Sequence, residues 1–120
     1  YVSGFLGYQN PARHPYEVVR YSMDTAVKRL EAYNVGQTIN SEQTATASPA
    51  NDESQILNDR RGAKLRPWLQ AFDLGAEYTP EMVHAQINAF YDAASSTPEF
   101  MNGYMLWNPS NVYAREAILP

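Results

Sequence analysis

The 120-residue sequence contains no cysteine, which excludes disulfide bonds, thiolate zinc sites and cysteine nucleophiles. It is also poor in basic residues: nine Lys and Arg against thirteen Asp and Glu give a formal net charge of −4. Nucleic-acid binding depends on clustered basic side chains, so we expect no nucleic-acid partner. No apolar run approaches the roughly 20 residues that a membrane span requires, so we expect no membrane span in this segment. Without a start methionine or a targeting segment, the sequence is interpreted as an excerpt from within a longer protein.

The sequence is rich in aromatic residues within a globular composition. Hydrophobic residues make up 44% and charged residues 18%, values typical of folded domains. Nine Tyr, four Phe and two Trp occur together with eight Pro. Aromatic rings on turns rich in Pro and Asn suit clefts that stack on sugars, but they also suit an ordinary core. Composition leaves both interpretations open.

Residues 15–33 have the pattern of an amphipathic helix. Pro15 suits the first helical turn, where its missing N–H has no intrahelical partner. Apolar residues then recur along one face at helical spacing, namely Val19, Met23, Ala26, Val27 and Leu30. The preceding residues 1–14 are punctuated by Gly and Pro and predict a loop.

Residues 34–62 change character. Asn, Ser, Thr, Gln and Ala dominate, and no helical or strand periodicity continues. Such side chains bury too little apolar area to offset the entropy of ordering the chain. We therefore expect a flexible surface insertion at about 34–62.

Two short apolar runs flank a second helix in the last part of the chain. KLRPWLQAF (64–72) and GYMLW (103–107) predict strands, and 112–119 predicts a last helical turn. A helix start is predicted at Thr79, Pro80 and Glu81. The apolar residues that follow at helical spacing are Val83, Ile87, Phe90, Tyr91 and Ala94, and the helix is predicted to end around Ser95 and Ser96. This alternation predicts an α/β fold with parallel strands. Because two strands cannot form a parallel sheet covered on both faces, we expect further strands outside this sequence.

The candidate functional residues lie where the two predicted strands end, because parallel α/β units carry their chemistry at the carboxyl ends of strands. An aromatic face and carboxamides are what recognition of a polyhydroxylated ring needs. The candidates for binding are Trp107, Gln70, Asn108, Asn111 and Trp68, and Asp73 is the acid found at a predicted strand end. The alternatives are that both Trp residues belong to the core, and that both Asn residues hydrogen-bond their own turns.

Motifs for other chemistries are missing. Glu81 and His84 have the Glu-x-x-His spacing of di-metal helices, but no second copy of this motif exists, so we expect no metal. Neither a glycine-rich phosphate loop nor a nucleophile-elbow serine is found, and we expect no cofactor.

Three strings together resemble a known family: HPYEVVRYSMDTAVKRL, KLRPWLQAFDLGAEYTPEMVHAQINAFYDA and GYMLWNPSNVY. They are similar to the C-terminal part of the bacterial glycoside-hydrolase-like proteins labelled DUF4015, over nearly the whole chain except 34–62. The resemblance implies a (βα)8 TIM barrel, in which 15–33 is about helix 6, 64–73 about strand 7 and 103–108 about strand 8. Residues 1–120 are then one incomplete C-terminal segment of a barrel domain.

The resemblance also implies hydrolysis of glycosidic bonds in a polysaccharide or oligosaccharide, and an exported or cell-envelope protein. The reaction generally requires two carboxyl groups. The resemblance implies that an acid often follows the Gln of WLQ, whereas this sequence has Ala71, which leaves Asp73 as the catalytic candidate. We therefore expect this chain to supply a substrate-facing wall and to be inactive alone. Two alternatives stay open: a carbohydrate-binding or cell-envelope barrel without catalysis, and an independent α/β interaction domain that uses 34–62 as a contact arm.

Overall fold

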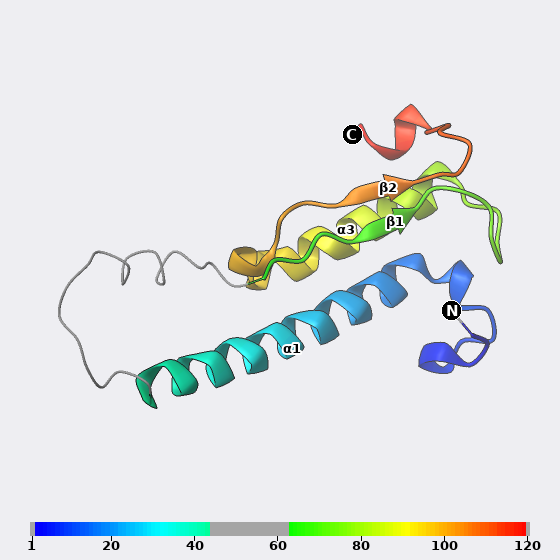
Figure 1. Ribbon diagram of the computed structural model, residues 1–120. Helices are drawn as coiled ribbons and strands as arrows, with labels where there is room; N and C mark the ends of the chain where they lie inside the picture. The colour runs from blue at the N-terminus through cyan, green and yellow to red at the C-terminus, as the bar shows by residue number, and fades with distance from the viewer. Residues whose placement is uncertain (1, 44–62, 120) are drawn as a thin grey trace.

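The computed structural model describes residues 2–43 and 63–119, and the side chains of 2–33 and 63–119. The main elements are helix α1 (Pro15–Gln43), strand β1 (Trp68–Gln70), helix α3 (Pro80–Ser96) and strand β2 (Met105–Trp107). Short 3-10 helices precede α1 (η1, Phe5–Gly7, and η2, Pro11–Arg13), follow α3 (η3, Pro98–Phe100) and end the described chain (η4, Arg115–Ala117). Figure 1 shows α1 and α3 running in the same direction, with the two strands along α3. The predicted α/β class is confirmed.

Helix α1 is longer than predicted. Its N-terminus lies at Pro15 as expected, but it continues to Gln43, so the expected end at residue 33 is wrong. Extending an existing helix adds one hydrogen bond per residue and avoids the unfavourable nucleation step, so a polar continuation without a periodic apolar face can stay helical. The start of the predicted insertion therefore belongs to α1, and residues 44–62 lie outside the described residues. No helix of the described chain is long and apolar enough to cross a membrane.

Helix α3 begins as the sequence predicts. The Thr79 hydroxyl accepts a hydrogen bond from the Met82 N–H, and Pro80 occupies the first turn. The first-turn Glu81 has a pKa lowered below its ordinary value, because its carboxylate accepts a hydrogen bond from the Thr79 hydroxyl and another from its own backbone N–H. Val83, Ile87 and Phe90 are buried as predicted, but Tyr91 is 57% exposed, so its place in the buried stripe was wrong.

The two strands form a parallel pair, as predicted, but both are shorter than their apolar runs. Trp68 pairs with Met105, Leu69 with Leu106 and Gln70 with Trp107. An isolated parallel bridge joins Leu65 to Met101 ahead of the first ladder pair, Trp68 and Met105. Leu65 is three residues before Trp68, whereas Met101 is four residues before Met105, so the second segment contains one extra residue. The extra residue lies within 102–104, where Gly103 takes a φ of 72° in the left-handed region. Pro67, which has no amide hydrogen to donate, lies opposite this interruption.

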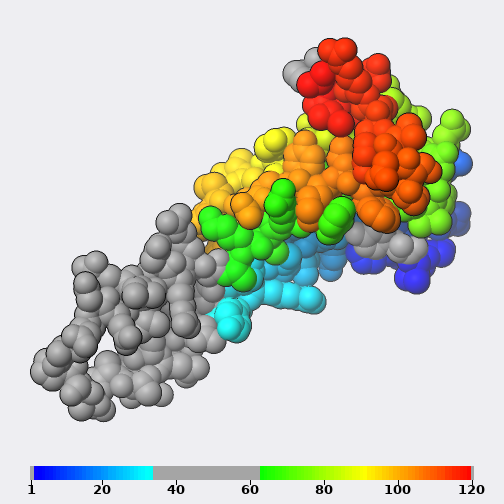
Figure 2. Space-filling model, turned by 45° about the horizontal axis from the view of Figure 1, so that its top comes forward, coloured from blue at the N-terminus to red at the C-terminus, as the bar shows by residue number. Residues whose placement is uncertain are grey.

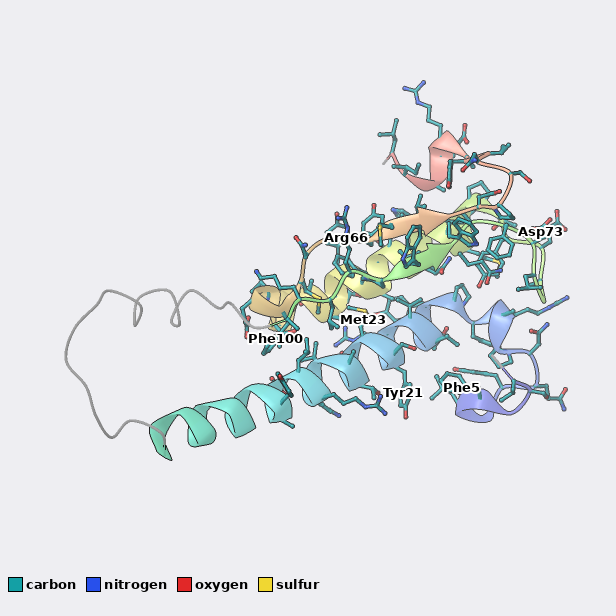
Figure 3. All side chains as sticks on the ribbon, viewed as in Figure 1. Phe5, Tyr21, Met23, Arg66, Asp73 and Phe100 are labelled. Carbon is teal, nitrogen blue, oxygen red and sulfur yellow. The ribbon has the colours of Figure 1, made fainter. Side chains whose placement is uncertain are left out.

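The core lies between the two helices and one face of the sheet. Leu69 is 1% exposed and packs with Val83, Ile87 and Ala117, which brings η4 onto α3. Met23 packs with Phe90 and Ala93 further along the helix pair. Figure 3 shows Met23 pointing from α1 toward α3. The Tyr16 hydroxyl donates a 2.7 Å hydrogen bond to Asp92, which also joins the two helices.

Candidate functional site

Trp68 and Trp107 lie on the face of the sheet that points away from α3. Side chains alternate along a strand, so Leu69 faces the core while Trp68 and Gln70 face the opposite way. The two indole rings meet edge to face, with centroids 5.9 Å apart and an interplanar angle of 88°. Trp68 is 62% exposed and Trp107 is 48% exposed. Neither indole is therefore buried in the core of the described chain, and their contact with a sugar stays a prediction.

Gln70 lies directly opposite Trp107 in the strand register, so the structure brings these two predicted residues together. The Gln70 side chain donates through Nε2 to the carbonyls of Phe72, at 2.8 Å, and Leu74, at 3.3 Å. It therefore shapes the loop that leaves β1. Its Oε1 accepts no hydrogen bond among the described residues, so this oxygen is the part of Gln70 that can receive a hydroxyl.

The Asn108 side chain hydrogen-bonds its own turn and also reaches the end of β1. Its Nδ2 donates to the carbonyls of Ala71 and Val112, and its Oδ1 accepts from the Ser110 N–H at 2.8 Å. The bond to Ala71 also ties the loop after β2 to the end of β1. These bonds support the turn interpretation, and a sugar contact of Asn108 stays a prediction.

Asn111 is exposed in the same loop and has a φ of 53°, in the left-handed region that Asn tolerates better than most residues. Its N–H donates to the Asn108 carbonyl at 3.0 Å, whereas its side-chain amide has no partner among the described residues. This amide is free to bind a ligand at the carboxyl end of β2.

Asp73 lies on the loop between β1 and α3. Figure 3 places it beyond β1, at the opposite end of the strand from Arg66. One carboxylate oxygen accepts a 2.7 Å hydrogen bond from the Tyr78 N–H, which closes the loop. The structure therefore gives Asp73 a structural function, while its catalytic assignment stays a weak prediction. Among the described residues, no group of three or more His, Asp or Glu residues is placed to hold a metal ion.

Sequence reasoning missed two polar residues that hold this region together. Asn10 donates through Nδ2 to the Gly75 carbonyl at 2.9 Å, and Gln86 on α3 hydrogen-bonds the backbone of Gln70. The importance of Gln86 could have been predicted from the sequence, because it lies between Val83 and Ile87 on the apolar face of α3, where a buried amide needs a hydrogen-bond partner. For Asn10, the sequence indicated only that it lies in a turn.

A groove of about 450 Å³ runs beside β1, on the edge away from β2. The first turns of α1 supply Pro15, Val18 and Val19 to its wall, and β1 supplies Trp68 and Gln70. In the space-filling view the segments of β1 (green) and β2 (orange) lie side by side at the surface (Figure 2). Trp68 and Trp107, one on each of these strands, are both exposed.

The fold and the site define a βαβ unit that carries aromatic and amide groups where its parallel strands end. A family model described as "Putative glycosyl hydrolase domain" (DUF4015) matches residues 1–113. The chain belongs to this family, which confirms the resemblance seen in the sequence. No curated protein and no solved structure matches the chain.

Proposed function

We propose that this chain forms one wall of the substrate cleft of a glycoside hydrolase and binds a polysaccharide or oligosaccharide. The observation that carries the proposal is the pair of exposed indoles, Trp68 and Trp107, beside Gln70 on the outer face of the sheet of a glycosyl-hydrolase-family chain. Flat apolar rings cover the faces of sugars, and amides hydrogen-bond their hydroxyl groups.

The architecture that we propose for the whole domain is a (βα)8 barrel, with β1 and β2 as about its seventh and eighth strands. Two features support this proposal: the strands are parallel, and α1 and α3 run in the same direction, as successive crossover helices of a barrel do (Figure 1). In such a barrel the face that carries Trp68 and Trp107 points to the interior, and the strand ends open at the mouth where active sites lie.

The edge of β1 away from β2 supports the same proposal. In a parallel sheet the backbone groups of every second residue bond to the strand on one side, and those of the residues between them point to the other side. The Pro67 carbonyl and the Ala71 N–H both bond to β2. The backbone groups of Trp68 therefore point to the opposite edge, where they have no partner among the described residues. The part of the groove beside Trp68 is the place for a sixth strand.

Residues 1–120 alone are not expected to cleave glycans. Glycosidic cleavage uses two carboxyl groups, and Asp73 is the one acid within the three residues that follow either strand of the described chain. The test is reducing-end release from a panel of xylan, cellulose, chitin and starch, by the intact protein and by residues 1–120. We expect release by the intact protein only, and equal turnover by the two would refute the assignment of the catalytic acids to other strands.

A non-catalytic carbohydrate-binding barrel is the second candidate. Ala71 favours it, because the family resemblance leads us to expect an acid at this position, and so does the use of the Asp73 carboxylate to close a loop. Affinity electrophoresis of the intact protein in gels that contain each polysaccharide separates the two. Retardation without reducing-end release supports the binding protein, and release supports the hydrolase.

A further inference from the structure

Gln86 makes an unusual pair of contacts from the middle of α3. Its side chain is buried, at 3% exposed. Its Oε1 accepts a 3.0 Å hydrogen bond from the Gln70 N–H, and its Nε2 donates a 2.7 Å hydrogen bond to the Gln70 carbonyl. One side-chain amide thus satisfies both backbone groups of a single strand residue, as a neighbouring strand does in a sheet.

These contacts lie on the edge of β1 that faces away from β2. The Ala71 N–H donates to the Trp107 carbonyl at 2.9 Å, and the Met105 N–H donates to the Pro67 carbonyl at 2.9 Å. The backbone groups of Trp68 and Gln70, which alternate with these residues, point to the other edge. Gln86 bonds both backbone groups of Gln70 on that edge, whereas the backbone groups of Trp68 keep no partner there among the described residues.

Gln70 in turn shapes the loop that follows β1. Its backbone is held by Gln86, and its side chain donates to the carbonyls of Phe72 and Leu74. A continuous chain of hydrogen bonds therefore runs from the buried face of α3, through Gln70, to the loop at the carboxyl end of the strand. Gln70 also lies opposite Trp107, so this chain ends beside the aromatic pair.

We propose that Gln86 is a positioning residue for the candidate site, a proposal that rests on the proposed function. Gln86 ends strand pairing on the outer edge of β1 at Gln70, and it fixes the orientation of Gln70 and of the loop through Leu74. A strand that pairs with Trp68 cannot continue to Gln70, because both backbone groups of Gln70 are taken. The side of the cleft next to Gln70 then stays open, where Gln70 and Gln86 both line the groove.

The direct test is hydrogen exchange resolved to single amides in the intact protein. Gln86→Leu introduces an apolar side chain of similar size and removes both hydrogen bonds. We expect the Gln70 amide to exchange about tenfold faster or more, because its acceptor is lost. The Ala71 amide, which is bonded to Trp107, should keep its protection. Unchanged protection of Gln70 would overturn the proposal.

Asn88→Leu is the matched control. Asn88 is an exposed amide on the same helix with no hydrogen-bond partner among the described residues, so its removal should leave the Gln70 amide unchanged. If Asn88→Leu accelerates exchange at Gln70 as much as Gln86→Leu does, the effect is a general loosening of α3 and the proposal fails.

Gln86→Glu provides a reversible version of the test. A protonated carboxyl has one donor and one acceptor, like the amide, whereas a carboxylate cannot donate to the Gln70 carbonyl. The residues that line the adjoining groove include Tyr78 as their only titratable group, and phenols do not titrate between pH 5 and 8. The carboxylate can still accept from the Gln70 N–H, but it repels the Gln70 carbonyl and so favours opening of the paired contact. We therefore expect the protection factor of the Gln70 amide in this variant to rise from pH 8 to pH 5, with no such rise in Gln86→Leu. Equal behaviour of the two variants would contradict the hydrogen-bonding role.

The glycan readout separates this inference from the proposed function. Binding of chitohexaose, xylohexaose and cellohexaose, followed by tryptophan fluorescence, should weaken in Gln86→Leu and recover in Gln86→Glu at pH 5. If the wild type binds none of these probes while the exchange pattern holds, the proposed function loses support and the control of the strand edge by Gln86 stands. If the wild type binds and Gln86→Leu binds equally well with an exposed Gln70 amide, Gln86 does not position the site.

Discussion

The indole rings of Trp68 and Trp107 meet edge to face across neighbouring strands, 5.9 Å apart, on the face of the sheet that α3 leaves uncovered. The edge-to-face contact limits the rotamers open to each ring, which reduces the ordering needed when a ligand binds. Preorganised rings lose little conformational entropy on binding. Among the described residues, this pair is the feature on which the proposed sugar contact depends.

Replacement of Trp107 tests the aromatic surface. Under the proposed hydrolase function, Trp107→Ala in the intact protein should lower kcat/KM on its polysaccharide substrate by about tenfold to a hundredfold, which corresponds to about 1–3 kcal/mol of stacking and burial. Trp107→Phe should retain most of the activity because it keeps a flat ring. Thermal unfolding of each variant is the control, and unchanged kinetics with unchanged stability would show that Trp107 does not touch the substrate.

Replacement of Leu69 tests the opposite face of the same strand. Leu69 is 1% exposed, so Leu69→Ala should lower the free energy of unfolding by about 2–5 kcal/mol through lost burial and a residual cavity. Leu74→Ala is the matched control, because Leu74 is 64% exposed and its truncation should change stability by less than about 0.5 kcal/mol. Urea denaturation of the intact protein measures both. Similar losses would mean that β1 does not face the core through Leu69.

The start of α3 predicts a pH dependence. The pKa of Glu81 is lowered by the Thr79 hydroxyl and by its own backbone N–H, so ionised Glu81 favours the folded state. A depressed pKa in the folded state contributes stability above the pKa of the unfolded chain, and this contribution is lost as the pH falls through the folded value. In urea titrations from pH 7 to pH 3, the stability difference between wild type and Glu81→Gln should therefore be largest at pH 7 and shrink toward pH 3.

Thr79→Ala is the partner experiment for Glu81. It removes the cap of α3 and should lower the free energy of unfolding by about 1 kcal/mol. It also removes the main cause of the lowered pKa of Glu81, so Glu81→Gln should alter the pH dependence less in this background. The same pH dependence with and without Thr79 would assign the effect to another group.

Local chemistry made the helix starts readable from the sequence. Pro15 begins α1, and the Thr79 cap with Pro80 begins α3, because these residues satisfy or avoid the unpaired N–H groups of a first turn without help from distant residues. The order of strands and helices, and their parallel arrangement, followed from the same local patterns. The end of α1 did not, because a helix can continue through polar residues without a periodic signal.

Which residues face solvent was decided by tertiary structure. Trp68, Leu69 and Gln70 are neighbours in one short strand, and alternation alone shows that Leu69 opposes the other two without showing which side is buried. The packing of α3 on the Leu69 side settled this, and it left Trp68 and Trp107 exposed.

The sequence by itself determined that this chain is an α/β segment with aromatic and amide residues at the ends of two parallel strands, because helix caps, apolar periodicity and turns are local. Only the tertiary structure decided which of those amides are available. Asn108 is used by its own turn, whereas Asn111 keeps a free side chain, and Gln86 on α3 hydrogen-bonds the backbone of Gln70 on β1. Such partners lie on different elements, and the packing that brings them within hydrogen-bonding distance is a property of the whole fold.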